Sequence, residues 1–284
     1  MNEYIVQKVL GNNIVQCKKP GEKSDYMVQG KGIGFHRKCG DPIPSEQIEK
    51  VYFQKDTEKI TQYLDLVERC EPLLVESVEE IIGRMEQRFG NSYDEYIHIA
   101  LLDHLNFSLY RLRNQIEINN IFLDEYRVIY VDEYAFAAEM VSYINHRLHI
   151  ELPESEIGLI ALHFHSALHK ENVSKSALYM QIIADSIAFI EDQLHEKLDR
   201  GSLERMRLVI HLKFALQRAE QKIELSNPVL DTLKDEYPEV YAIAVSLARM
   251  LREKFGLQLQ EGELGYLVLH IQNIVLTLKT HGKE

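Results

Sequence analysis

Four histidines of this chain occupy matching positions in an internal repeat. His104 and His163 recur 107 residues later as His211 and His270, and none of the other eight of the twelve histidines has a match. Histidine is neither a strong helix former nor a residue that is buried at little cost. Its retention at both positions in both copies therefore needs a cause other than apolar packing.

Three roles are chemically possible for such histidines, and the repeat alone does not distinguish them. A half-buried imidazole can join helices by hydrogen bonds, bind a metal ion, or accept a phosphoryl group, because neutral imidazole is a nucleophile near pH 7. The metal alternative draws on His163, His165 and His169, but Gln272 and Leu276 replace the last two in the second copy. No HExxH motif or Cys–His cluster accompanies them, so we predict no metal site.

Residues near the histidines favour phosphoryl acceptance. Asp103 adjoins His104 and could fix its tautomer, and Arg111 and Arg218 follow their histidines by seven residues, two helical turns along one face. Such an arginine could hold a phosphate through a charge-assisted fork, or could pair with a local carboxylate instead. We expect phosphorylation at His104, His163, His211 and His270, supported by Asp103, Arg111 and Arg218.

The same register extends over about a hundred residues and defines two helical domains. Leu105, Tyr134 and Gly158 match Leu212, Tyr241 and Gly265, with apolar residues at helical spacing between them. We therefore predict all-α domains at 58–171 and 172–284. The matching glutamates at 154 and 156, and at 261 and 263, are expected in the acidic first turns of the helices that carry His163 and His270.

The N-terminal region has a different pattern, in which short apolar–polar alternations are separated by turn residues. This pattern predicts a small antiparallel β domain over residues 1–57. So small a unit buries little surface, and pairing with a second copy would stabilise it. The predicted strands are Tyr4–Leu10, Ile14–Lys18, Tyr26–Gln29, Ile33–Lys38 and Ile48–Phe53.

Composition and charge limit the class of protein. Hydrophobic residues make up 45% of the 284 and charged residues 27%, as in an ordinary globular chain. Three separated cysteines, the lack of a secretory signal pattern and the lack of a long apolar run predict a reduced, cytoplasmic protein without membrane insertion. Net charge is −12, yet residues 1–50 carry eight Lys/Arg against six Asp/Glu, so the β domain is the part suited to an anionic partner.

Several motifs together resemble the BglG/SacY family of bacterial transcriptional antiterminators. They are KVLGNN at 8–13, GKGIGFHRKCGD at 30–41, LLDHLNFSLYR at 101–111, EIGLIALHFHSAL at 156–168, LVIHLKFALQR at 208–218 and ELGYLVLHI at 263–271. The resemblance covers essentially the whole chain. It is closest to the glucose-type members of the family.

The resemblance implies a fold and a partner. The β domain would be a four-stranded, dimerising co-antiterminator domain that binds a hairpin in leader mRNA and prevents a terminator from forming. The helical domains would be phosphotransferase-system regulation domains (PRD). Phosphocarrier protein HPr and a sugar-specific enzyme II would phosphorylate their histidines. Phosphorylation of the first domain without sugar would inactivate the protein, and sugar transport would restore expression of a sugar permease operon, by resemblance that for glucose.

The resemblance also implies an RNA-binding surface of polar, glycine and aromatic residues. Gly11 stands where many relatives have a third Asn, and Lys31 where several have Arg, which removes a bidentate fork. Both departures bear on the RNA target. A plain hairpin turn would also explain the Gly-x-Gly run, and Phe35 could belong to a core or dimer interface. The implied RNA-binding residues are Lys8, Asn12, Asn13, Gly30, Lys31, Gly32 and Phe35.

Two other classes of function compete with this hypothesis. A DNA-binding activator with the same regulatory domains would need an N-terminal helix-turn-helix, against the period-two pattern there. A phosphotransfer enzyme would need one exposed reactive histidine instead of two matched pairs. The chain lacks a Walker A loop, a dinucleotide-binding GxGxxG and a Ser–His–Asp context, so we predict no catalytic residues and no cofactor.

Overall fold

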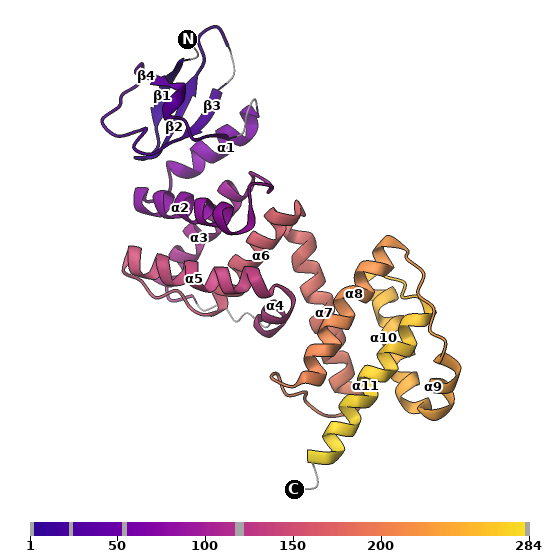
Figure 1. The fold of residues 1–284 in the computed structure, drawn as a ribbon. Coiled ribbons are helices and arrows are strands. Elements are labelled where there is room, and N and C mark those ends of the chain that lie inside the picture. The colour runs from indigo at the N-terminus through magenta and orange to yellow at the C-terminus, as the bar shows by residue number, and fades with distance from the viewer. Residues whose placement is uncertain (1–2, 23–24, 53–55, 117–121, 282–284) are drawn as a thin grey trace. The chain divides into compact units, whose positions relative to one another are not determined.

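The computed structural model describes residues 3–22, 25–52, 56–116 and 122–281, as a β sheet followed by helices (Figure 1). The chain divides into two compact units. One consists of residues 1–119 and 132–172, and the other of residues 120–131 and 173–284. Because the first unit joins the β domain to helices of the first repeat, this division does not test the domain limits expected at 57/58 and 171/172.

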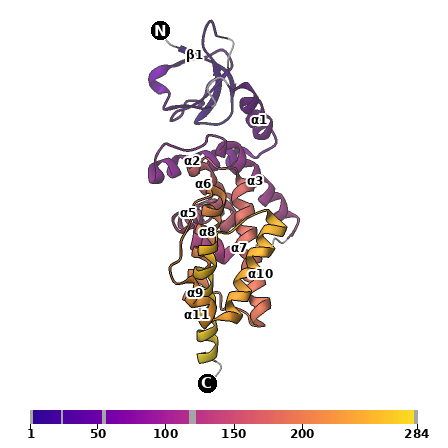
Figure 2. The ribbon, with the colours of Figure 1, turned by 90° about the vertical axis from the view of Figure 1, so that its right-hand side faces the viewer.

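Five strands form one antiparallel sheet in the order β4-β1-β2-β3-β5. Alternate residues point to opposite faces. Val15 and Val28 lie in a core within the β domain, whereas Ile14 and Met27 join the core of the neighbouring helices. The sheet is therefore buried on two faces, with α1 beside β3 (Figure 1, Figure 2). The strands are β1 (Glu3–Val9), β2 (Ile14–Lys18), β3 (Asp25–Gln29), β4 (Pro42–Pro44) and β5 (Lys50–Tyr52).

The strand predicted at Ile33–Lys38 is wrong. These residues form successive turns, and the extra strand of the sheet is β4, so the sheet has five strands where the resemblance implied four. Buried Ile33 and exposed Phe35 imitate strand alternation, but Gly32 has φ +66° and His36 has φ +57°, which extended backbone excludes. Phe53, at the end of another predicted strand, lies outside the described residues.

Helices of the first unit pack around one apolar core. The face of the sheet that carries Ile14 and Met27 also packs against this core. Helix α2 begins with a proline and ends before Gly90 at φ +91°, which are the usual start and stop residues. Helix α3 contacts α1, α2 and α6, so it is the central helix of this unit. The helices are α1 (Thr57–Val67), α2 (Pro72–Phe89), α3 (Ile97–Arg113), α5 (Val131–Leu148) and α6 (Ser155–His169).

The second unit repeats this arrangement and adds one helix from the first repeat. Helix α4 packs on α7 and α8, with a buried ion pair between Glu125 and Arg205, whereas its repeat counterpart α9 packs on α10 and α11. Ser202 caps α8 by accepting a hydrogen bond from the backbone N–H of Arg205. The helices are α4 (Leu123–Ile129), α7 (Val173–Leu194), α8 (Leu203–Gln221), α9 (Leu230–Glu236), α10 (Pro238–Phe255) and α11 (Glu261–His281).

Among the described residues, no helix combines the length and the apolar character needed to cross a bilayer.

Candidate functional site

The first repeat brings its two matched histidines together. His104 lies on α3 and His163 on α6, and these helices pack against each other. The centroids of the two imidazole rings are 4.8 Å apart, with the ring planes inclined at 48°. The two histidines that the sequence register singled out in this repeat are thus in direct contact.

A buried carboxylate links this histidine pair to the predicted arginine. Oε2 of Glu156 lies 3.0 Å from Nε2 of His104 and accepts a hydrogen bond of 2.8 Å from the hydroxyl of Ser108. Arg111 donates to the other oxygen, Oε1, at 2.7 Å, and to the Ser108 hydroxyl at 2.9 Å. Burial alone would raise the pKa of Glu156, but the hydrogen bonds and charges of His104, Ser108 and Arg111 lower it, so the carboxyl is ionised near pH 7.

The second histidine of the pair is neutral at physiological pH. Burial lowers the pKa of His163 from 6.5 to about 3, and the neighbouring His104 contributes to the shift. Its Nδ1 is buried and has no hydrogen-bond partner among the described residues. A neutral imidazole keeps a lone pair on one ring nitrogen, which is the requirement for nucleophilic attack on phosphorus.

The second repeat builds the same arrangement from α8 and α11. The ring centroids of His211 and His270 are again 4.8 Å apart, inclined at 35°. Nε2 of His211 lies 3.5 Å from Glu263, whose two oxygens accept from Nε and Nη2 of Arg218 at 2.5 and 3.0 Å. Burial, with the nearby His270 and Arg218, lowers the pKa of His211 to about 3.

The two sites differ in how the carboxylate is held. Ser108, which bonds Glu156 in the first repeat, corresponds to Ala215 in the second, where the arginine forms a bidentate fork instead. The carboxylate of the second site is therefore engaged more fully by its arginine and less closely by its histidine.

Both arrangements suit a switch based on charge. A phosphoryl group on a histidine adds about two negative charges and three acceptor oxygens. At His104 it would meet the carboxylate of Glu156 and the guanidinium of Arg111, two groups that already bind each other. Phosphate would compete for Arg111 and repel Glu156, which would disturb the contact between α3 and α6.

The structure gives Asp103 a different position from the one expected. Asp103 is exposed, and the carboxylate bonded to His104 is that of Glu156. Arg111 and Arg218 form ion pairs with Glu156 and Glu263, which is the alternative to phosphate binding that the sequence allowed. Glu156 and Glu263 do lie in first helical turns, but their role as links between His and Arg was missed, although both keep the repeat register.

Residues predicted to bind RNA lie mainly on two loops of the β domain that are bonded to each other. The side chain of Asn13 accepts from the backbone N–H of Gly32 at 2.8 Å, and the carbonyl of Asn13 accepts from that of Gly30 at 3.0 Å. A Cβ on Gly30 would lie 2.0 Å from the carbonyl oxygen of Gln47, so only glycine fits there. Phe35 is 61% exposed, which excludes it from the core of the β domain, and its ring contacts that of His36, with the ring centroids 4.0 Å apart.

Two of the predicted RNA contacts are occupied by carboxylates of the helical part. Lys8 forms an ion pair with Glu68, just after α1, and the amide of Asn12 donates to Glu76 of α2 at 3.1 Å. Both pairs lie at the solvent-exposed surface of the first unit. An RNA phosphate or base edge would have to replace these carboxylates to reach Lys8 and Asn12.

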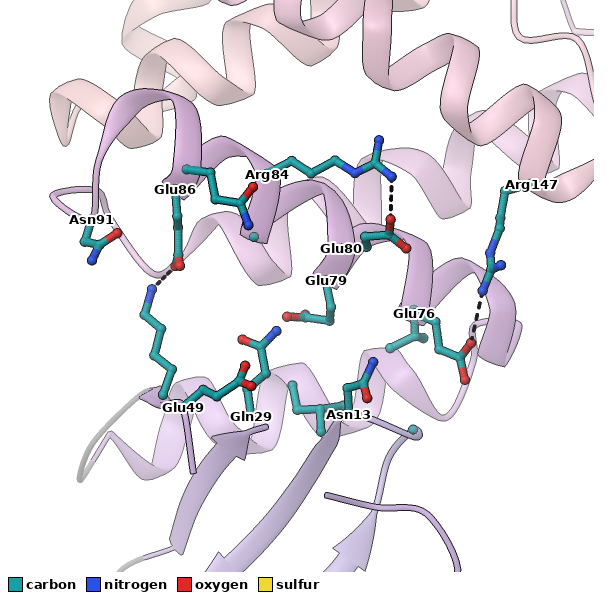
Figure 3. A pocket seen from close by; sticks show the side chains of 16 residues that line it. Asn13, Gln29, Glu49, Glu76, Glu79, Glu80, Arg84, Glu86, Asn91 and Arg147 are labelled. Carbon is teal, nitrogen blue, oxygen red and sulfur yellow. Dashed lines mark hydrogen bonds and ion pairs between the residues drawn. The ribbon is translucent and has the colours of Figure 1, made fainter. Parts of the chain in front are cut away.

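A cleft of about 730 Å³ lies beside these contacts, between the sheet and α2 (Figure 3). Three cations in its lining pair with lining carboxylates: Lys50 with Glu86, Arg84 with Glu80, and Arg147 with Glu76. Glu49 and Glu79 add further carboxylates to the wall. The cleft is net acidic and therefore unsuited to RNA phosphates.

Two family models match separate parts of this chain. Residues 4–61 match the family model of the CAT RNA binding domain. Residues 79–167 and 184–274 match that of the PRD domain. The two PRD matches each contain one histidine pair, His104 and His163 or His211 and His270.

Curated relatives match along nearly the whole chain. Protein GlcT of Staphylococcus saprophyticus subsp. saprophyticus is 31% identical over 281 residues, covering 97% of this chain and 98% of the relative. The GlcA/glcB genes antiterminator of Staphylococcus carnosus is 31% identical over 276 residues, covering 96% of both chains. Among solved structures, one titled "Crystal structure of GlcT CAT-PRDI" aligns with a TM-score of 0.52 and 37% identity, covering 58% of this chain and 98% of that one.

Proposed function

Because this chain belongs to the BglG/SacY family of transcriptional antiterminators, with a CAT RNA binding domain and two PRD regions, we propose that it is an antiterminator controlled by the phosphotransferase system. It binds a hairpin in leader mRNA, prevents a terminator from forming and allows expression of a sugar permease operon. The names of the relatives support glucose as the sugar.

The observation that carries this proposal is the repeated arrangement of two histidines, a buried glutamate and an arginine. It occurs in both helical repeats, at α3/α6 and at α8/α11. Apolar packing gives no reason to keep such a costly set of groups twice. We propose His104, His163, His211 and His270 as the phosphorylation sites. The guanidinium groups of Arg111 and Arg218 would then bind the phosphate oxygens.

A contact between α3 and the sheet offers a route from the first site to the RNA-binding domain. His98, six residues before His104 on α3, is buried against the ring of Tyr52 in β5, with ring centroids 4.2 Å apart. Its Nδ1 lies 2.9 Å from the carboxylate of Glu79 on α2. Movement of α3 caused by phosphate at His104 would therefore change the contacts by which the β domain packs on α2 and α3.

The proposed RNA-binding surface consists of the two bonded loops and the end of β1. Asn side chains supply donors and acceptors, Phe35 a stacking face, and Lys8 and Lys31 contacts to phosphates. In the present conformation Glu68 and Glu76 engage Lys8 and Asn12, so the first helical repeat competes with RNA for them. The proposed residues are Lys8, Asn12, Asn13, Gly30, Lys31, Gly32 and Phe35.

The finer parts of the function rest on the family resemblance and the sequence. We propose HPr and a sugar-specific enzyme II as phosphoryl donors, a homodimer as the RNA-binding form, and the cytoplasm as its place of action. The protein accepts phosphate and is not an enzyme. Its domain limits are 1–57, 58–171 and 172–284.

A DNA-binding activator with PRD regions is the alternative, and it would need a helix-turn-helix near the N-terminus. Between residues 3 and 52, the described residues form the sheet and one short 3₁₀ turn. Nothing in that part of the chain favours the alternative.

RNA binding is tested with the unphosphorylated full-length chain and a labelled leader hairpin, by fluorescence anisotropy. We expect binding that weakens at least about fivefold in Phe35→Ala, because loss of one stacked base costs roughly 1–3 kcal/mol. Phe214→Ala, an exposed phenylalanine on α8, serves as the matched control and should bind as the parent does. Equal affinity of all three proteins would remove Phe35 from the RNA surface, and no binding to any cognate leader would refute the proposal.

The phosphorylation sites are tested by phosphopeptide mapping after incubation with HPr and enzyme II. We expect label on one or more of His104, His163, His211 and His270. Label confined to His165 or His169 would contradict the repeat argument.

A further inference from the structure

Helices α5 and α6 bring together three side chains that the proposed switch does not use. Glu133 lies in the first turn of α5, and His165 and His169 lie one helical turn apart on α6. Oε1 of Glu133 is 2.8 Å from Nδ1 of His165 and 3.8 Å from Nε2 of His169. One donor atom from each residue lies within 4.8 Å of the others. All three residues belong to the first compact unit.

These residues have the types and the spacing of a transition-metal site. Two histidines at i and i+4 project from one face of a helix, and a carboxylate completes a three-ligand set. Two donors bound to one tetrahedral Zn²⁺ at about 2.0–2.1 Å lie roughly 3.3 Å apart. The two separations from the Glu133 oxygen, 2.8 and 3.8 Å, lie on either side of that value, and the exposed side chain of His169 has room to adjust.

The cluster offers room for a fourth ligand from solvent. The side chain of His169 is 56% exposed, whereas those of His165 and Glu133 are 15% and 13% exposed. An ion held by one exposed and two half-buried ligands would keep a position open to water. This combination of nitrogen and oxygen donors favours a divalent ion of borderline softness over Mg²⁺ or Ca²⁺, which prefer oxygen alone.

Comparison of the two repeats separates this cluster from the phosphorylation sites. At the positions of Glu133, His165 and His169, the second repeat has Val240, Gln272 and Leu276. All three ligand types are lost together, whereas the paired histidines, the glutamate and the arginine are retained. From the sequence, this lack of counterparts argued against a metal role. With Glu133 in place, it argues only against a role shared by both repeats.

His165 also faces away from the phosphorylation site. It contacts Glu133 of α5, while His163, two residues earlier on α6, lies against His104 of α3. Two residues along a helix correspond to about 200°, so the two side chains leave opposite sides of α6. An ion at the cluster would therefore link α5 to α6 without taking a nitrogen from His104 or His163.

We propose that Glu133, His165 and His169 form a binding site for one divalent transition-metal ion, for which Zn²⁺ is the probe. The bound ion links the start of α5 to the end of α6 and so stabilises the position of α6, the helix that carries His163. The site is specific to the first repeat.

Metal binding is tested with the untagged full-length chain after removal of metal by a chelator, titrated with Zn²⁺ against a chromophoric competitor. We expect one site per chain, with affinity reduced at least about tenfold in His169→Ala, because one of three ligands is lost. His146→Ala, an exposed histidine on α5 outside the cluster, is the matched control and should bind as the parent does. Equal affinity in the parent and His169→Ala, or no stoichiometric binding by the parent, would overturn the proposal.

Co²⁺ provides a second readout that distinguishes the ligands. Visible d–d bands of a four- or five-coordinate ion should form in the parent and in His146→Ala and be absent from His169→Ala. A sulfur-to-cobalt charge-transfer band would place the ion at a cysteine and contradict the assignment.

Discussion

Replacing Glu156 with Gln tests the charge arrangement at the phosphorylation site proposed for the first repeat. The side chain keeps its shape but loses the negative charge that Arg111 and His104 share. Breaking a buried ion pair costs about 3–5 kcal/mol, and the amide oxygen of Gln retains part of the hydrogen bonding, so we expect a loss of roughly 1–3 kcal/mol in unphosphorylated protein. The glutamate is 2% exposed, so solvent does not screen the effect.

The phosphorylated form of the same variant should behave in the opposite way. A phosphate at His104 would lie near the Glu156 carboxylate, and two unit charges 4 Å apart repel by about 4 kcal/mol at an effective dielectric constant of 20. Gln removes this repulsion and frees Arg111 to bind the phosphate. Phosphorylation should therefore destabilise the first unit of the parent and destabilise it less, or stabilise it, in Glu156→Gln.

Thermal unfolding followed by circular dichroism measures both effects, because the chain has no tryptophan to serve as a fluorescence probe. A domain of this size shifts by about 2–4 °C for each kcal/mol. Glu151→Gln, an exposed residue five positions away, is the matched control and should leave the transition unchanged. The reasoning is refuted if phosphorylation shifts the parent and Glu156→Gln equally.

Three further predictions follow from single contacts. The double change Glu68→Gln and Glu76→Gln should raise RNA affinity several-fold at low salt and less at high salt, by anisotropy; a decrease would exclude competition between these carboxylates and RNA. Burial lowers the pKa of His211 to about 3, so below pH 6.5 the unfolded state binds a proton at this residue that the folded state does not bind. Stability is therefore unaffected by His211 above pH 6.5 and falls as the pH drops below it. At pH 5 the contribution of His211 to this loss is about 2 kcal/mol, and His211→Asn should reduce the pH-dependent loss of stability by that amount, while the contribution of buried His163 remains; identical pH profiles of parent and variant would show that His211 titrates normally. Gly30→Ala should unfold or distort the β domain, because the added methyl meets the carbonyl of Gln47, and native melting of that variant would contradict the close approach.

Local sequence patterns predicted the parts of the fold that depend on neighbouring residues. The alternation in β2 and β3 and the helical register of the repeats need only nearby residues and one buried face. The same rule failed at Ile33–Lys38, where positive φ at Gly32 and His36 produces turns with a buried and an exposed side chain in alternation. Hydrogen bonding between the two loops, not local preference, holds that segment in place.

The candidate site shows the same division between local and tertiary information. The register singled out His104 and His163 because a duplicated pattern reports a shared constraint, whereas their contact with each other depends on the packing of α3 on α6. It also marked Glu156, but a glutamate in a first helical turn already has a local explanation, so its contact with Arg111 was visible only in the packed helices. The meeting of Glu133 with His165 depends on the packing of α5 on α6, which no spacing in the sequence encodes.

The central claim is that phosphate on the first repeat controls RNA binding by the β domain. It is tested most directly by measuring the affinity of the full-length chain for its leader hairpin before and after phosphorylation by HPr and enzyme II. We predict that phosphorylation weakens binding at least about tenfold, or 1.4 kcal/mol, in the parent and leaves the double variant His104→Ala/His163→Ala, which lacks both proposed acceptors of the first repeat, unchanged. Equal affinity of the two forms of the parent, or the same loss in the double variant, would contradict the account.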